Sequence, residues 1–106
     1  MTCGSLKYWG GVALVCALVS GCATPFYMTR LRSAEENFEE ARKLEAERYA
    51  PYEFYGAEAR LNESRRLASE AEYGSAITLA EQAEDLAKAA VKNSRDARNR
   101  ASEAKK

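Results

Sequence analysis

From Leu31 onward, small and apolar side chains return every three or four positions, which is the spacing of one face of an α-helix. In the first stretch these side chains are Leu31, Ala34, Phe38, Ala41 and Leu44. In the second they are Phe54, Ala57, Leu61, Ser64, Ala68 and Ala71. In the third they are Ala76, Ala80, Ala83, Ala87 and Ala90, flanked by Ile77, Leu79, Leu86 and Val91. The pattern therefore predicts three helices and an all-α fold.

Two interruptions set the predicted helix boundaries. Proline disfavours helical geometry in the residue before it and suits the first position of a helix, so one helix should end near position 49 and the next should begin at Pro51. Gly74 can supply the positive φ that closes a helix, and Ser75 can cap the helix that follows. The expected helices then span about 31–49, 51–72 and 75–101.

The short second break predicts how the helices are arranged. Two long helices joined by about three residues must fold back on each other, so 51–72 and 75–101 should form an antiparallel hairpin. Alanine-lined faces allow the two backbones to approach closely, although each alanine buries little area. The N-terminal helix can cover the remaining groove and complete a three-helix arrangement. A second copy of the chain or another partner could cover the groove instead.

The start of the chain has the features of an export signal. One basic side chain, Lys7, precedes a run from Tyr8 to Val19 that has no charge and is too short to cross a bilayer. The sequence Val19-Ser20-Gly21-Cys22 follows, and it fits the lipobox of bacterial lipoproteins. We therefore expect residues 1–21 to be a lipoprotein signal peptide and Cys22 to receive the lipid. The alternatives are an ordinary secretory signal and an uncleaved anchor.

Residues 22–30 are expected to form a lipidated tether before a helical domain at 31–106. Pro25 and nearby threonines argue against regular structure there. Phe26 and Tyr27 are expected either at the lipid headgroups or in contact with the first helix. A capping box of Ser33 and Glu36 would mark the start of that helix.

Composition removes most catalytic and metal chemistry from the predicted mature chain. It has no histidine, and all three cysteines lie at or before position 22. The common nucleophile–base pairs, most zinc sites and disulfides are therefore excluded. Beyond the processing region only Gly56 and Gly74 remain, so no glycine-rich phosphate loop exists. We expect no enzyme, no cofactor and no metal.

The aromatic cluster Tyr49, Tyr52, Phe54 and Tyr55 surrounds Pro51 at the first corner. Large rings at such a corner fill the gap where helices meet, with the phenol groups in water. The same rings also suit a partner-binding patch, because tyrosine is enriched at interfaces. Tyr52 and Tyr55 are the two that we expect to be partly exposed.

Charge is unevenly distributed along a chain with 16 basic and 16 acidic side chains. Residues 33–48 hold six acids and three bases, whereas residues 88–106 hold seven bases and two acids. An export signal argues against a nucleic-acid partner for this basic end. A frayed, solvated helix end suits the helix dipole, and an anionic headgroup, wall polymer or acidic partner is the alternative.

The tyrosine–proline corner, followed by an Ala-rich helix and by Tyr73-Gly74-Ser75-Ala76-Ile77, resembles domain of unknown function 4398. This family contains short bacterial envelope proteins, many of them with lipoboxes, and the resemblance covers about 34–90. Residues 72–83 also resemble one tetratricopeptide-repeat hairpin, although an array needs about three repeats. The resemblance implies a helical envelope protein and lends no catalytic residues.

The leading functional hypothesis is an outer-membrane lipoprotein whose helices bind or scaffold an envelope protein or peptidoglycan-associated protein. Ala23, which is not aspartate, favours outer-membrane sorting and a periplasmic domain. The alternative is a structural tether between membrane and peptidoglycan, with Lys106 as the wall attachment, as in the short outer-membrane lipoprotein joined to the wall by its terminal lysine. A homo-oligomer fits either hypothesis.

Overall fold

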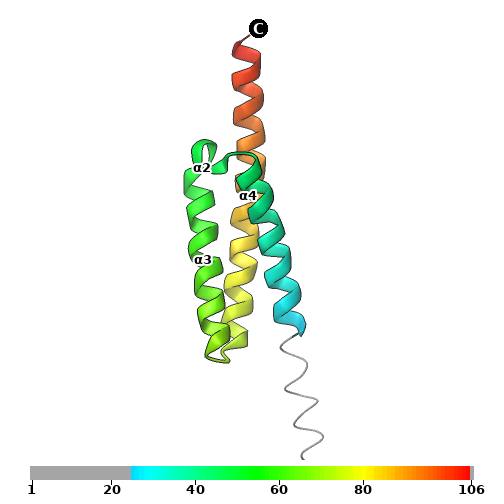
Figure 1. The fold of residues 1–106 in the computed structure, drawn as a ribbon, viewed down its shortest axis with the longest axis vertical. Helices are drawn as coiled ribbons and strands as arrows, with labels where there is room; N and C mark the ends of the chain where they lie inside the picture. Colours follow the sequence, from blue (N-terminus) through cyan, green and yellow to red (C-terminus); the bar gives the residue numbers. More distant parts are fainter. Residues whose placement is uncertain (1–24, 106) are drawn as a thin grey trace, which may run out of the picture.

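Helices account for nearly all of residues 25–105, which are the residues that the computed structural model describes, and no strand occurs among them. The first helix covers 25–43 and is the unlabelled cyan helix of Figure 1. It is followed by α2 (Ala46–Tyr49), α3 (Pro51–Ser69) and α4 (Tyr73–Ala104). The predicted all-α fold, with an antiparallel hairpin and an additional N-terminal helix, is confirmed.

The three long helices run up, down and up (Figure 1). The antiparallel pairing of α3 with α4 is fixed at both ends by hydrogen bonds. Asn93 donates to Glu53 Oε1 at 3.1 Å, and the Ser64 hydroxyl donates to the carbonyl of Ala76 at 2.6 Å. Helix 25–43 runs parallel to α4. Arg30 near its start pairs with Glu81, and Glu40 near its end pairs with Arg95, which lies farther along α4.

The core is built mainly of alanine. Ten alanines among residues 25–105 are buried, and the five that line α4, at 76, 80, 83, 87 and 90, have no exposed surface. Larger side chains enter the core from the other helices, and Phe38 stacks on Phe54 with 4.7 Å between ring centroids. We call Ala76, Ala80, Ala83, Ala87, Ala90 and the fully buried Ser94 the alanine seam.

The predicted irregularity of residues 25–30 is wrong, because this segment is helical. Tyr27 is buried and packs on Tyr73 with 5.8 Å between ring centroids, which supports the packing alternative for this residue. Phe26 is half exposed. Tyr27, Leu31 and Ala34 are buried on one helical face, so packing of these side chains against α4 favours helix despite the local sequence. The helix therefore does not begin at the predicted capping box.

The first corner also differs from the prediction, since helix 25–43 ends six residues before position 49. Glu45 has a left-handed backbone with φ 59°, and the short α2 follows it. This bend buries Ala46 and Ala50 across the end of the bundle, where a straight helix would carry them into water. Pro51 occupies the first turn of α3 as predicted, and Ala50 before it is non-helical with φ −143°.

The second corner lies at Glu70–Glu72 instead of at Gly74. The amide of Glu72 donates to the Leu67 carbonyl at 2.9 Å, and the amide of Ala71 donates to the Ala68 carbonyl at 3.0 Å. These two bonds, with Ala71 at φ 61°, form a Schellman motif that closes α3. The predicted positive φ at Gly74 is wrong: Gly74 lies inside α4, which begins at Tyr73 because Tyr73 packs on Tyr27.

Two substitutions to or from glycine test the position of this corner through their effect on the free energy of unfolding. Ala71→Gly should raise the free energy of unfolding by about 1 kcal/mol, because alanine pays a steric penalty at positive φ. Gly74→Ala should raise it by about 0.5–1 kcal/mol, since a Cβ at this helical position meets nothing within 4 Å. Urea unfolding measures both changes. A loss of stability in Gly74→Ala would contradict the observed corner and restore the predicted one.

The last helix continues well past the rest of the bundle. With 32 residues, α4 is about 48 Å long, whereas the 19 residues of α3 span about 28 Å. α3 ends and α4 begins at the corner Glu70–Glu72, so the end of the longer α4 projects as a single helix beyond α2 (Figure 1). We call residues 97–105 the C-terminal arm. The arm is helical through Ala104.

Candidate docking surface

The two ends of the bundle differ in what they expose. Residue 25 and the corner at Glu70–Glu72 lie at one end, and the corner around Pro51 and the C-terminal arm lie at the other (Figure 1). We call the second end the distal end.

The predicted aromatic cluster divides into core and surface. Phe54 is 1% exposed and stacks on Phe38, so its candidacy as a partner-binding residue is wrong and it acts as the corner plug. Tyr49 is half-buried beneath the guanidinium of Arg48. Tyr52 is 80% exposed and Tyr55 is 54% exposed, which confirms the exposure predicted for these two side chains.

Tyr52 lies at the level where α4 leaves the bundle. Glu53, its neighbour in the first turn of α3, accepts the hydrogen bond from Asn93, three residues before Asp96 in α4. From Asp96 onward every described residue of α4 except Ala97 is exposed. The exposed Tyr52 and the basic end of α4 therefore both lie at the distal end, although they are far apart in sequence.

A set of charged contacts holds helix 25–43 parallel to α4. Arg30 pairs with Glu81 at 3.5 Å, and Arg95 pairs with Glu40 farther along both helices. Between them, Ser33 donates a hydrogen bond of 2.9 Å to Oε1 of Glu84, whose side chain is only 12% exposed. Glu84 also pairs at 2.8 Å with Lys88, one turn later in α4, whereas its contact with Ser33 joins residues 51 positions apart and has no signal in the sequence.

The environment of Glu84 favours its charged form. The hydrogen bond from Lys88 lowers the pKa of Glu84 most strongly, and the Ser33 hydroxyl lowers it further, while burial acts in the opposite direction. The same ion pair raises the pKa of Lys88. Glu84 thus acts as a charged link between helix 25–43 and α4.

A pH dependence of stability follows from Glu84. Because its pKa in the folded chain lies below the ordinary 4.5, the unfolded chain takes up the proton first as pH falls. The free energy of unfolding should therefore decrease as pH falls below about 5, and the contribution of Glu84 should be absent below its folded pKa. Urea unfolding between about pH 6 and pH 3 measures the slope. Glu84→Gln should reduce this slope relative to the unaltered chain, and an unchanged slope would contradict the role assigned to Glu84.

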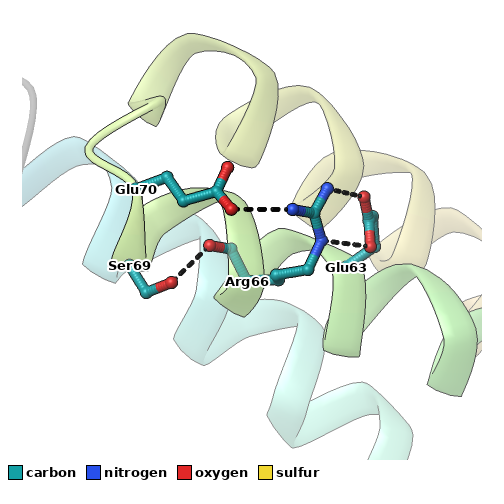
Figure 2. A network of polar contacts seen from close by, with 4 residues as sticks. All are labelled: Glu63, Arg66, Ser69 and Glu70. Carbon is teal, nitrogen blue, oxygen red and sulfur yellow. Dashed lines mark hydrogen bonds and ion pairs between the residues drawn. The ribbon is translucent and has the colours of Figure 1, made fainter.

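Two other surface features, a charged network on α3 and a groove beside it, do not form candidate functional sites. Figure 2 shows Arg66 between Glu63 and Glu70 on α3, with donor–acceptor distances of 2.5 and 2.9 Å, and Ser69 donating to the Arg66 carbonyl. Arg66 lowers the pKa of Glu63, whose carboxylate is satisfied by this pair at the helix surface. An open groove of about 340 Å³ lies between helix 25–43 and α3, but its apolar floor is closed by the buried Phe38 and Leu61.

Several predicted sites fall outside the described residues. These are the lipidation site Cys22, the lipobox residues Val19, Ser20 and Gly21, and the candidate wall attachment Lys106. Within residues 25–105 no cluster of three or more His, Cys, Asp or Glu side chains is placed to hold a metal ion. No helix in that same part of the chain is long and apolar enough to span a membrane.

Comparisons with known proteins give no further guide, because no family model, no curated protein and no solved structure matches the chain.

Proposed function

We propose that this chain is a lipid-anchored, non-catalytic helical module of the bacterial outer membrane that holds an envelope partner on the periplasmic side. The observation that carries the proposal is the exposed aromatic and basic character of the distal end. Both the 80% exposed Tyr52 and the basic C-terminal arm belong to this end, which is opposite to the end that carries residue 25. A lipid on Cys22 would present this end to the periplasm.

The anchoring half of the proposal rests on sequence alone. The lipobox Val19-Ser20-Gly21-Cys22 follows an uncharged apolar run, and Ala23 favours sorting to the outer membrane. Two or three acyl chains on one cysteine give stable anchoring, where a single chain is marginal. The resemblance to domain of unknown function 4398 points to the same compartment. Cys22→Ala should move the protein from the membrane fraction to the soluble fraction.

Site-specific photo-crosslinking in cells tests the binding half. A crosslinking amino acid at Tyr52 or at Ala101 should capture a discrete partner, because both positions are exposed at the distal end. The matched control is Ala59, which is exposed at the middle of α3. Equal capture from Ala59, or no capture at the distal positions above a chain carrying only the signal and lipobox, would contradict the proposal.

A second candidate function is a tether between outer membrane and peptidoglycan. The basic arm favours it, because the arm extends away from the end that carries residue 25. Covalent attachment through Lys106 predicts a form that stays with the sacculus after boiling in detergent and is released by muramidase. Deletion of Lys106 should abolish that form. If the unaltered protein yields no sacculus-bound form, the attachment hypothesis fails.

A further inference from the structure

The first turn of helix 25–43 exposes two large apolar side chains. Among residues 25–105 the exposed large hydrophobic side chains are two tyrosines near Pro51 and, in this turn, Phe26, which is 48% exposed, and Met28, which is 51% exposed. The turn lies at the end of the bundle opposite the C-terminal arm (Figure 1). Exposed apolar side chains that are gathered in one place indicate an interaction surface, whereas scattered ones need no explanation.

The two side chains lie on opposite sides of the helix. Successive residues of an α-helix are about 100° apart, so Phe26 and Met28 are about 200° apart. Tyr27 lies between them and is buried against Tyr73. A flat surface that runs along the side of the helix can therefore contact only one of the two. A surface that lies across the end of the helix can contact both.

An arginine follows each of these apolar side chains one turn later. The guanidinium carbon of Arg30 lies 5.1 Å from the ring centroid of Phe26. Arg32 is exposed and follows Met28 by four residues, which puts it on the same side of the helix. From the end of the helix inward, apolar groups thus come first and guanidinium groups second. Side chains that enter a phospholipid layer have this order, with apolar groups at the acyl boundary and cations at the headgroups.

The charges at this end indicate which kind of phospholipid surface fits. Arg30 pairs with Glu81 at 3.5 Å, and at the neighbouring corner Arg66 pairs with Glu70 at 2.9 Å. The corner also carries the exposed Glu72. Carboxylates therefore balance the arginines, and this end has no excess positive charge to attract an anionic surface. Burial of the apolar side chains provides the attraction, so a zwitterionic phospholipid layer is sufficient.

The proposed function supplies such a layer at this end of the bundle. Cys22, the expected lipid acceptor, is three residues before Pro25 in the sequence. A lipid on Cys22 would therefore hold the membrane within a few residues of the first turn. We propose that Phe26 and Met28 insert into the headgroup layer of that membrane, so that the bundle stands end-on upon it with its distal end turned away. This inference rests on the proposed function.

Tryptophan fluorescence tests the contact, because the only tryptophan of the chain, Trp9, lies in the expected signal peptide. Phe26→Trp and Met28→Trp, made in separate chains, each place a reporter in the first turn. The lipidated protein is reconstituted in phosphatidylcholine vesicles whose acyl chains carry bromine near the headgroups. Both reporters should be quenched by the bromine, and both should emit at shorter wavelength than Tyr52→Trp. The Tyr52→Trp chain is the control at the distal end, and it should not be quenched.

A carboxylate in the first turn separates insertion from mere proximity to the lipid. Met28→Asp, added to the Phe26→Trp chain, should remove most of the quenching, because the charge would have to leave water at the acyl boundary. Tyr55→Asp, added to the same chain, replaces a similarly exposed side chain near the distal end and should leave the quenching unchanged. Circular dichroism should show the same helix content in both variants, since both replaced side chains are half exposed.

Three results would overturn the inference. If neither reporter is quenched more than the Tyr52→Trp control, the bundle does not contact the membrane. If only one reporter is quenched, the helix lies along the membrane and does not stand on it. If the quenching in the Phe26→Trp chain survives Met28→Asp, attachment through Cys22 alone keeps the reporter near the lipid.

Mass spectrometry of the same purified protein reports the acylation of Cys22 separately. A chain without acyl groups would contradict the proposed function, and the end-on contact with it. An acylated chain whose reporters are not quenched would leave the proposed function standing and would contradict only the end-on contact.

Discussion

Phe54→Ala is expected to lower the free energy of unfolding by about 4 kcal/mol, the largest effect of any single substitution considered for this chain. Phe54 is 1% exposed and contacts two other rings, with centroid distances of 4.7 Å to Phe38 and 5.3 Å to Tyr55. In a core made mostly of alanine, few other side chains can move to fill the space. A domain of this size is stable by about 4–12 kcal/mol, so the variant should be close to unfolded.

Urea unfolding followed by circular dichroism measures this change. The control is Tyr52→Ala, another aromatic truncation in the first turn of α3, which should stay within about 0.5 kcal/mol because Tyr52 is 80% exposed. The comparison separates the buried Phe54 from the exposed Tyr52 within the predicted aromatic cluster. Equal losses in both variants would mean that Tyr52 packs in the core and does not face a partner.

Ala87→Leu is expected to lower the free energy of unfolding by about 2–3 kcal/mol, although leucine is nearly as good a helix former as alanine. Ala87 has no exposed surface and lies at the middle of the alanine seam, where helix 25–43 and α3 both pack on α4. The larger side chain must push a neighbouring backbone away. Thermal and urea unfolding measure the loss.

The matched control for Ala87→Leu is Ala101→Leu, at an equivalent seam position on the exposed arm. It should change stability by less than about 0.5 kcal/mol, because no helix among residues 25–105 covers that position. A neutral Ala87→Leu would mean that the helices are farther apart than the complete burial of the seam indicates. A destabilising Ala101→Leu would mean that the arm is covered in the free protein.

Residue types alone predicted that aromatic side chains near Pro51 would be exposed, but they did not determine which of the four would be. The cluster around Pro51 predicted exposed tyrosines, and Tyr52 and Tyr55 are exposed. Phe54 has the same neighbours in sequence, yet it turns toward Phe38 in a different helix, and only the packing of 25–43 against α3 decides this. The buried Ser94 gave a signal in sequence, because it continues the alternating alanine spacing, but its missing hydrogen bond depends on the surrounding helices.

The helix boundaries also divide into one that a single residue determines and one that depends on tertiary packing. Proline restricts φ whatever surrounds it, so the start of α3 at Pro51 could be predicted from one residue. Gly74 can adopt positive φ but does not need to, and the turn instead formed at Ala71 with φ 61°. Packing of Tyr73 on Tyr27 extends α4 back past the glycine, and that contact joins residues 46 positions apart.

For this protein, the sequence by itself determined the features that depend on neighbouring residues. These are the all-α fold, the antiparallel hairpin, the proline start of α3 and the absence of histidine, the commonest general base. Tertiary structure alone decided the features that depend on distant residues meeting. It made 25–30 helical, placed both corners, buried Phe54 and left the end of α4 without a covering helix among residues 25–105. The reason is physical: backbone preferences act over a few residues, whereas burial is settled only when all the helices have packed.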